Sequence, residues 1–341
     1  MFVRARLLQH GWDADLHIER SAALPQPEAG QVRVRVGACG VAYRDVIDRS
    51  GRVAFMRVPI TMGHEAAGVV EALGEGVTQW QVGDTVATMH RDFCGACRFC
   101  DAGETSLCQD AFHVFGLLAD GGFASHLVAP ENALYRVPQA MPVAHAAVLL
   151  SAWGTAWRGL HKFGPIGPGH RVVVTGANGG VGSAAVQLAT RLGAEVVGVV
   201  RDEKHADFVS SQGAFRVATC SDGRYELGAW QADLALDCVG AATFASSMRA
   251  LRLGGGLVAI GNIQDAKVPL SIGRVIVGGL KIAGSTGATR SDMASLLDHH
   301  GQRPLNFPIA ATYPLTAADQ AMRKVRAGGN EGRVVLDCHA A

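Results

Sequence analysis

The sequence predicts an α/β protein in which a doubly wound parallel sheet is joined to a mostly antiparallel, barrel-like domain carrying a metal-binding lobe. Three observations predict this. Short valine-rich runs, broken by turn-forming residues, fill the chain before about residue 150. After it, apolar strand patterns alternate with helical patterns. Four cysteines also lie close together between residues 94 and 108.

The first half of the chain contains the predicted antiparallel strands. The stretches QVRVRVGA, 31–38, and HEAAGVVEAL, 64–73, are rich in valine and other apolar residues that favour strands. The segments GEGVTQWQVGD, 74–84, and PENALYRVP, 130–138, hold the glycine, proline and polar residues that interrupt such strands. We therefore expect residues 1–151 to form one mostly antiparallel domain.

The four neighbouring cysteines predict a metal site. In HRDFCGACRFCDAGETSLC, 90–108, their gaps allow the thiolates of Cys94, Cys97, Cys100 and Cys108 to converge on one zinc ion. Four thiolates fill a tetrahedral shell, so this zinc would stabilise a lobe over 90–110 without touching substrate. A pair of disulfides or an iron–sulfur cluster are the alternatives. The remaining cysteines are expected to be buried or idle thiols: Cys39, Cys220, Cys238 and Cys338.

The second half predicts a parallel sheet with crossover helices. HRVVVTG, 170–176, is typical of a buried strand, GVGSAAVQLATRLG, 180–193, of a helix, and AEVVGVV, 194–200, of the next strand. The order repeats with ADLALDCVG, 232–240, AATFASSMRALRLGG, 241–255, and GLVAIGN, 256–262. Alternating strands and helices of this kind form a doubly wound sheet with right-handed crossovers.

The apolar stretch GRVIVGGLKIAG, 273–284, ends this half of the chain. As a strand at the edge of the sheet it would expose unpaired backbone groups and apolar side chains, which favours pairing with a second copy. We therefore expect a homodimer, or a tetramer built from such dimers.

Composition and charge exclude some kinds of partner. The chain has 341 residues, 48% of them hydrophobic, and a formal net charge of +1. Scattered basic residues and near-zero charge argue against a nucleic-acid partner or an anionic membrane surface, and leave a small-molecule substrate. The first residues, MFVRARLLQHGWDADLHIER, lack the apolar run of a signal peptide, and no run spans a bilayer, so a cytoplasmic protein is expected.

The turn GANGGVG, 176–182, joins the first strand of the parallel sheet to its helix. Glycines there let the backbone approach a pyrophosphate, whose charge then lies at the helix N-terminus. The motif alone is weak, because the chain has 43 glycines. Its place between a strand and a helix, with a second strand following, predicts a dinucleotide cofactor.

The end of the next strand predicts which nicotinamide cofactor binds. Proteins that select NAD usually place an acid there for the ribose 2'-hydroxyl, but this sequence has Val200, followed by Arg201 and then Lys204. Two cations suit a 2'-phosphate, which predicts NADP(H) in preference to NAD(H). In the alternative, Asp202 or Glu203 turns towards the ribose and the cations are merely solvated.

Several motifs together resemble the medium-chain dehydrogenase/reductase superfamily. They are GHEAAGVV at 63–70, the cysteine lobe, GGVG after a strand, and the closing GRVVL from Gly332. The chain is most similar to the branch of acryloyl-CoA reductases and zinc-binding dehydrogenases, on the residues YRD at 43–45, the stretch 239–262 and KIAGSTGATRSDM at 281–293.

The resemblance implies a GroES-like catalytic domain over 1–151, a Rossmann domain over 152–285 and a return of 286–341 to the first domain, with the active site between the domains. Together with the glycine turn and the cations after Val200, it implies a set of cofactor contacts. These are Thr155, Gly176, Asn178, Gly179, Gly180, Val181, Gly182, Arg201, Lys204, Val239 and Arg333.

Zinc alcohol dehydrogenases of this family hold a second, catalytic zinc, and here the sequence departs from their pattern. His64 is present, with Glu65 beside it and Asp45 where relatives orient the histidine. The two cysteine ligands of relatives are replaced by Ala42 and Ser151. Cys39, on the far side of Gly40 from Ala42, is an alternative thiolate ligand, but packing in the protein core is the simpler explanation of this residue. We therefore expect the catalytic zinc to be absent.

The proton relay of these alcohol dehydrogenases is missing too, because Arg44 and Ile47 stand where they place a hydroxyl and a histidine. Alcohol oxidation normally relies on a Lewis acid, whereas reduction of an activated alkene needs oriented hydrogen-bond donors. The sequence therefore predicts an NADPH-dependent reductase of enones or enoyl thioesters, with Tyr43, Arg44 and His64 as catalytic candidates. An alcohol or aldehyde dehydrogenase and a noncatalytic NADPH-binding protein are the alternatives.

Overall fold

A computed structural model describes residues 1–339. The described chain divides into two compact units, and each is described by itself. The first contains Met1–Ser151, Thr289–Met293 and the described residues from Ile309 onward; the second contains Ala152–Ala288 and Ala294–Pro308. The segment 286–341, expected to return whole to the first domain, is thus divided, because 286–288 and 294–308 group with the second unit.

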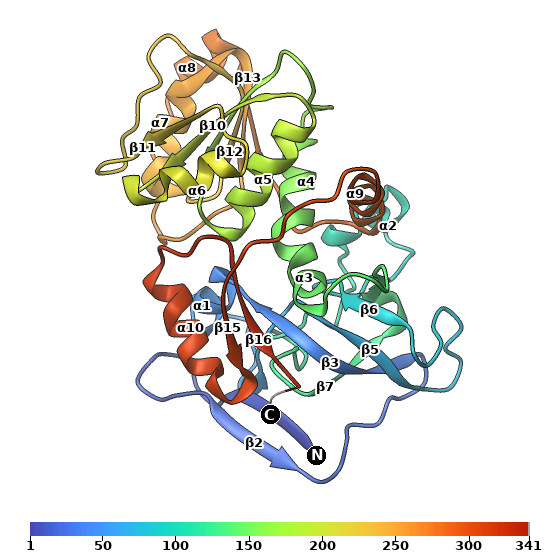
Figure 1. Ribbon diagram of the computed structural model, residues 1–341. Helices are drawn as coiled ribbons and strands as arrows, with labels where there is room; N and C mark the ends of the chain where they lie inside the picture. The colour runs from blue at the N-terminus through green and yellow to red at the C-terminus, as the bar shows by residue number, and fades with distance from the viewer. Residues whose placement is uncertain (340–341) are drawn as a thin grey trace. The chain divides into compact units, whose positions relative to one another are not determined.

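The first unit is built on a largely antiparallel sheet with the strand order β15-β16-β3-β5-β6-β8, and β7 also pairs with β3 (Figure 1). Only β15 and β16 pair in parallel among these described strands. Alternate valines of β3 point into the core and are at most 2% exposed. The strands are β3 (Gln31–Val41), β5 (Ala66–Leu73), β6 (Thr85–Thr88), β7 (His126–Pro130), β8 (Leu134–Arg136), β15 (Ile309–Pro314) and β16 (Arg333–Asp337).

A smaller antiparallel sheet of order β2-β1-β4 completes the strands of this unit. Its members are β1 (Phe2–Leu7), β2 (His17–Ser21) and β4 (Ile60–Thr61). The helices of the unit are α1 (Tyr43–Arg49), α2 (Arg98–Asp101), α3 (Val143–Val148) and α10 (Ala318–Ala327), and α9 (Arg290–Gln302) runs from this unit into the second.

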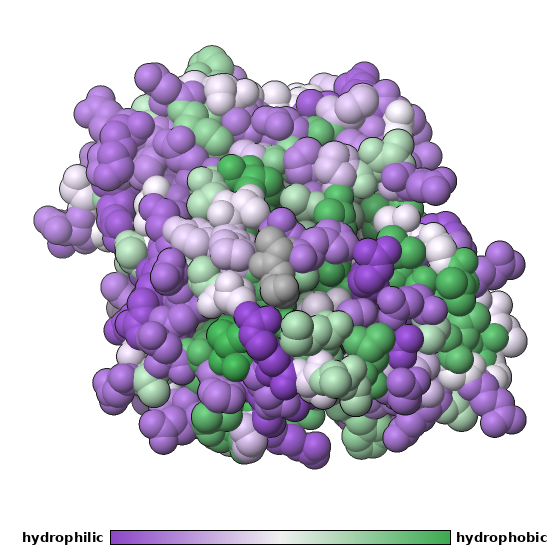
Figure 2. Space-filling model, turned by 60° about the horizontal axis from the view of Figure 1, so that its bottom comes forward, coloured by the Kyte–Doolittle hydropathy of each residue, from purple (hydrophilic) through white to green (hydrophobic). Residues whose placement is uncertain are grey.

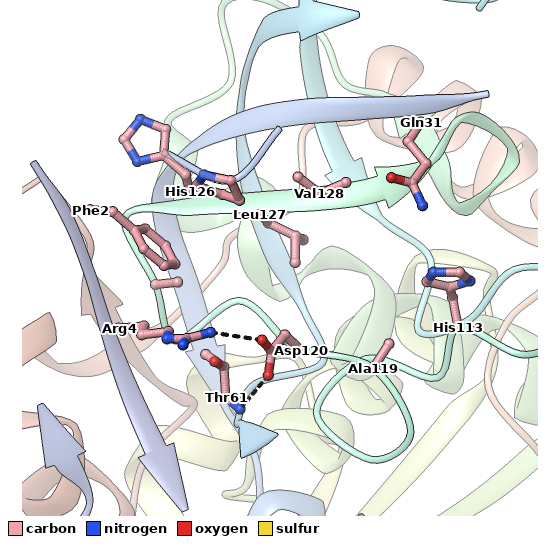
Figure 3. Close-up of a pocket in the computed structure, with 13 residues that line it drawn as sticks. Phe2, Arg4, Gln31, Thr61, His113, Ala119, Asp120, His126, Leu127 and Val128 are labelled. Carbon is pink, nitrogen blue, oxygen red and sulfur yellow. Dashed lines mark hydrogen bonds and ion pairs between the residues drawn. The ribbon is translucent and has the colours of Figure 1, made fainter. Parts of the chain in front are cut away.

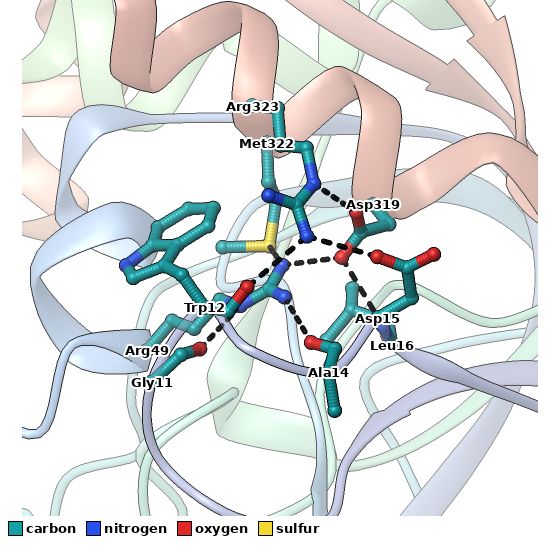
Figure 4. A network of polar contacts seen from close by, with 9 residues as sticks. All are labelled: Gly11, Trp12, Ala14, Asp15, Leu16, Arg49, Asp319, Met322 and Arg323. Atoms are coloured by element: carbon teal, nitrogen blue, oxygen red, sulfur yellow. Dashed lines mark hydrogen bonds and ion pairs between the residues drawn. The ribbon is translucent and has the colours of Figure 1, made fainter.

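Helix α1, which carries two of the predicted catalytic residues, is anchored at its last residue. The Arg49 guanidinium is fully buried and donates to Asp319 Oδ1 of α10 at 2.6 Å and to the carbonyl oxygens of Gly11 and Ala14 (Figure 4). It also stacks on Trp12, 4.1 Å from the ring centroid. These contacts fix α1 to both α10 and the loop before β2.

The second unit is a parallel sheet of order β11-β10-β9-β12-β13-β14, with helices between its strands (Figure 1). This confirms the predicted α/β fold. The strands are β9 (Arg171–Thr175), β10 (Glu195–Val200), β11 (Arg216–Thr219), β12 (Ala232–Asp237), β13 (Leu251–Ala259) and β14 (Lys281–Gly284). The helices are α4 (Thr155–Leu160), α5 (Gly180–Arg191), α6 (Ala206–Ser211), α7 (Ala241–Ala250) and α8 (Ile272–Gly278).

Two elements differ from the sequence expectation. The helix expected over 241–255 ends at Ala250, and 251–255 begin β13, because the run of glycines at 254–256 disfavours a helix. The stretch 273–284 was expected to be one strand, but 272–278 form α8 and only 281–284 form β14. Ser271 accepts from the Arg274 N–H and begins α8, and Gly279, with φ of +57°, ends it.

The surface mixes residue types. Figure 2 shows hydrophilic residues over most of the face in view, with smaller hydrophobic areas between them. None of the helices in the described part of the chain combines the length and the apolar character needed to cross a membrane.

Candidate functional site

The structure brings the four cysteines of the lobe together. The sulfur atoms of Cys94, Cys97, Cys100 and Cys108 all lie within 4.8 Å of one another. The chain reaches this arrangement through the short helix α2, which separates Cys97 from the last cysteine, and a 3-10 turn at Thr105–Leu107. Hydrogen bonds from backbone N–H groups, first that of Gln109, lower the pKa of the Cys97 thiol to about 6, which favours the thiolate that binds metal. The donor set suits one closed metal site.

The second group of polar residues surrounds His64, before β5. Its Nδ1 lies 2.8 Å from Asp45 Oδ1, and the other oxygen of Asp45 accepts from the Ala42 N–H at 2.8 Å. Both side chains are at most 4% exposed. Burial alone would raise the pKa of Asp45, but His64 and the Ala42 N–H outweigh it and lower that pKa. Asp45 therefore stays ionised and orients the imidazole, leaving Nε2 as its remaining polar atom.

The other predicted catalytic residues lie on α1. Arg44 Nε donates to Asp48 Oδ2 at 3.2 Å, one helical turn away, and the Arg44 side chain is 33% exposed. Burial raises the pKa of Asp48, which Arg44 partly offsets. Tyr43 begins the helix and packs, partly buried, against the core of the first unit. Both side chains are therefore partly exposed.

Glu65, next to His64, forms a buried ion pair with Arg333 at the start of β16. Burial lowers the pKa of Arg333 to about 10. Arg333 was expected to contact the cofactor; the structure places it in the first unit, with its guanidinium against Glu65. Arg333 is thus linked through Glu65 to the segment that carries His64.

Ala42 and Ser151 occupy the two positions where cysteine zinc ligands were expected from the resemblance. Ala42 caps α1 and is 6% exposed, and Ser151 lies in a π-helical turn, Leu149–Gly154. Cys39 is fully buried in β3, and burial raises the pKa of its thiol well above the usual range. Among the described residues, only the four lobe cysteines form a group of three or more metal-binding side chains.

The second unit carries the predicted dinucleotide turn between β9 and α5. Gly176, with φ of +60°, turns the chain at the end of β9. A Cβ on Gly182 would collide with the Gly176 carbonyl oxygen, so only glycine allows the first turn of α5 to pack against the turn. Asn178, Gly179, Gly180 and Val181 lie between them, and Thr155 begins α4 of the same unit. The turn is therefore tightly packed against the start of α5, as in the predicted strand–turn–helix arrangement.

Asp237, at the end of β12, forms hydrogen bonds that connect the end of β12 to the end of β9, where this turn begins. It was not among the residues predicted from sequence. Its buried carboxylate accepts from the Thr175 hydroxyl at 3.0 Å and from the backbone N–H groups of Val239 and Gly240 at 3.0 and 2.9 Å. It also accepts from the Thr243 and Ser247 hydroxyls. An acid at the end of an otherwise apolar strand, LALD, is the sequence signal.

Val239 itself lies against the turn, since a Cβ on Gly176 would be 3.1 Å from its Cγ2. Asp237 therefore holds together the ends of β9 and β12, including Val239, which was predicted to contact the cofactor.

The end of β10 presents the predicted cations. Val200 is buried, and Arg201 is exposed with no ion pair to any residue in the described part of the chain. Lys204 is paired with Asp202 at 2.7 Å, and Asp202 also accepts from the Lys204 N–H. Arg201 is therefore the cation available to an anionic ligand, whereas Lys204 is already neutralised.

A hollow in the first unit contains none of the predicted catalytic residues (Figure 3). Asp120 at its edge accepts from Arg4 and from the Thr61 N–H. Both charges are thus satisfied within the protein, and we assign no reaction to this hollow.

Comparison with known proteins identifies the family. The model of the alcohol dehydrogenase GroES-like domain matches 28–139, and that of the zinc-binding dehydrogenases matches 180–300. An acryloyl-coenzyme A reductase of Sulfurisphaera tokodaii is 31% identical over 313 residues, covering 92% of this chain and 93% of that one. An alcohol dehydrogenase of Geobacillus stearothermophilus is 30% identical over 320 residues, covering 92% and 93%.

Among solved structures, the cobalt- and zinc-bound thermostable alcohol dehydrogenase of Pyrobaculum aerophilum is similar, with a TM-score of 0.89 and 31% identity over 99% of this chain and 100% of that one. The first unit is thus GroES-like and the second is a Rossmann unit. The chain belongs to the medium-chain dehydrogenase/reductase superfamily of oxidoreductases, in a branch similar to the acryloyl-CoA reductases.

Proposed function

We propose that this oxidoreductase uses NADPH to reduce activated alkenes, either enones or enoyl thioesters, without a catalytic zinc. The observation that carries the proposal is the donor set around His64. Its expected companions are Ala42 and Ser151, neither of which offers a thiolate. One imidazole with a neighbouring carboxylate seldom holds zinc firmly without a third ligand. The Lewis-acid route to alcohol oxidation therefore lacks its metal-binding residues.

The residues of the second unit fit a dinucleotide. Gly182 in the turn leaves no room for a Cβ, and Arg201 supplies an unpaired cation for a 2'-phosphate. When bound, NADPH supplies the hydride that adds to the β-carbon of the alkene. The turn and Arg201 bind and orient the cofactor, and Asp237 keeps the turn in shape.

The polar group around His64 fits the substrate end of this reaction. Addition at the β-carbon moves negative charge to the carbonyl oxygen, which fixed hydrogen-bond donors stabilise. The Arg44 guanidinium has donors to spare, because Asp48 engages it through Nε alone. His64 Nε2 is a donor only when the imidazole is protonated, because Nδ1 faces the ionised Asp45. The Tyr43 hydroxyl is the remaining predicted donor for a proton to the α-carbon.

The relative named acryloyl-coenzyme A reductase supports a thioester of an unsaturated acid as the substrate class. The relatives named alcohol dehydrogenases favour the second candidate, an alcohol or aldehyde dehydrogenase. We further propose that the cysteine lobe binds one structural zinc, and that NADPH is preferred to NADH.

The experiment that separates the two candidates compares substrates on wild-type protein. NADPH consumption is followed with a panel of enones and enoyl-CoA thioesters, and NADP reduction with primary and secondary alcohols. We expect turnover of at least one activated alkene that a mild chelator leaves unchanged. Faster alcohol oxidation that the chelator abolishes would contradict the proposal and favour the alcohol dehydrogenase.

A further inference from the structure

One partly buried histidine of the first unit is used neither by the metal lobe nor by the group around His64. His90 follows β6 and precedes the first lobe cysteine, Cys94, by four residues. Its imidazole forms no hydrogen bond or ion pair with any residue that the structure describes. The ring nitrogens are therefore not engaged by the described part of the protein and remain available to a ligand.

The pairing of β5 with β6 brings the segment that carries His90 next to the segment that carries His64. Strands β5 and β6 pair antiparallel, with Ala67 opposite Ala87 and Gly68 opposite Val86. The Ala66 N–H donates to the Thr88 hydroxyl at 3.0 Å, so the two segments stay adjacent at the next step. His64 and His90 each lie two residues beyond this contact, and His64 is among the charged groups that act on the pKa of His90.

The backbone of His90 is held on both sides while its ring is free. Its carbonyl oxygen accepts from the Phe115 N–H at 3.2 Å, and the preceding Met89 N–H donates to the Ala133 carbonyl oxygen at 2.8 Å. Arg91, next in the chain, forms an antiparallel bridge with Val114. A ring on a fixed backbone loses little conformational freedom when it binds a ligand, as a preorganised donor should.

The charged groups near His90 keep it neutral. Burial, followed by the positive charges of Arg44, His64 and Arg91, lowers its pKa well below the usual value. The acids of this neighbourhood are already engaged: Asp45 with His64, and Asp48 with Arg44. A neutral imidazole still carries one N–H, and such a group can polarise a carbonyl.

We propose that His90 is a catalytic residue whose neutral N–H donates a hydrogen bond to the carbonyl oxygen of the substrate as negative charge develops there. This inference rests on the proposed reduction of activated alkenes and names a further donor for it. His90 transfers no proton; it stabilises the charge on oxygen, beside His64 and Arg44. The substrate class it serves is any alkene conjugated to a ketone or thioester carbonyl.

The test compares three variants. His90→Phe keeps a planar ring without a donor, His90→Gln keeps an N–H donor, and His126→Phe removes a half-buried imidazole from the hollow in Figure 3 as a control. With an enone or crotonyl-CoA, His90→Phe should lower kcat by about 100- to 1,000-fold, as removal of one oxyanion donor does. His90→Gln should retain most of the rate, and His126→Phe should match wild type. Equal kcat for His90→Phe and wild type would overturn the role of His90 while leaving the proposed function intact.

A second measurement does not depend on turnover. In ¹⁵N-histidine-labelled protein, the ring nitrogen signal of His90 is assigned by its absence from the His90→Phe spectrum. With NADP, which cannot donate hydride, addition of 2-cyclohexenone or crotonyl-CoA should shift this signal in the wild-type protein. A shift without reduction by NADPH would support the His90 contact and contradict the proposed function. Reduction of the alkene without any shift in this signal would contradict the contact.

Discussion

Replacing Arg201 by alanine should separate the two nicotinamide cofactors. Its guanidinium is exposed at the end of β10 and has no ion pair within the described residues, so it is free to bind a 2'-phosphate. A charge-assisted hydrogen bond of this kind contributes about 1 to 3 kcal/mol. This corresponds to a loss of about 5- to 150-fold in NADPH affinity. NADH lacks the 2'-phosphate, and its affinity should change little.

Lys204→Ala is the matched control. The Lys204 ammonium already pairs with Asp202 at 2.7 Å and is 67% exposed, and such surface pairs contribute at most about 1 kcal/mol. Its NADPH affinity should therefore fall by less than about fivefold. Dissociation constants of both cofactors are measured by calorimetric titration at fixed salt, since the phosphate contact is screened. If Arg201→Ala weakens NADPH and NADH equally, Arg201 does not contact the 2'-phosphate.

Four further predictions follow from the two units. Cys97→Ser should lower the zinc content, about one per chain in wild type, and destabilise the lobe in a thermal melt; an unchanged zinc content would exclude the cysteine site. Asp237→Ala should cost about 2 to 4 kcal/mol of unfolding free energy in urea and weaken NADPH binding, because two N–H groups lose their acceptor. Asp237→Asn keeps one acceptor oxygen and should lose less stability. Equal stability of the two variants would contradict this explanation. Arg49→Met should cost about 3 to 5 kcal/mol, because a fully buried guanidinium that pairs with Asp319 and donates to two carbonyl oxygens is lost. Arg323→Met, whose arginine also pairs with Asp319 but is 43% exposed, should cost below about 1 kcal/mol (Figure 4). Similar losses in the two variants would refute the distinction. Light scattering should show a homodimer, and Ile276→Asp on the exposed face of α8 should favour the monomer. A wild-type monomer at micromolar concentration would refute assembly through the sheet edge formed by β14.

The sequence predicts best what depends on neighbours along the chain. The gaps between the lobe cysteines are short, so their convergence follows from local geometry. The glycine turn is likewise local: a strand, a turn and a helix within residues 171–191 determine its shape. Valine-rich runs predict strands of the two larger sheets because β-branched residues fit a buried, pleated surface.

Other features depend on contacts between distant segments, which a single sequence does not show. Arg333 pairs with Glu65 across 268 positions of the chain, so its role beside His64 was not visible from its motif. The nearness of the His90 segment to the His64 segment depends on the pairing of β6 with β5, which the sequence alone does not show. The error at 272–278 has a local cause, because a short apolar run fits a strand or a helix equally well and the cap at Ser271 decides between them.

The most direct test of the central claim restores the missing ligands. Ala42→Cys combined with Ser151→Cys would surround His64 with the donor set of a zinc-dependent alcohol dehydrogenase. Zinc per chain and chelator sensitivity of alkene reduction are measured for this variant and for wild type. We predict about one zinc and chelator-insensitive reduction of an enone or enoyl thioester in wild type, and a second zinc only in the variant. Two tightly held zinc ions in wild type, with chelator-sensitive oxidation of an alcohol exceeding any alkene reduction, would contradict the proposed function.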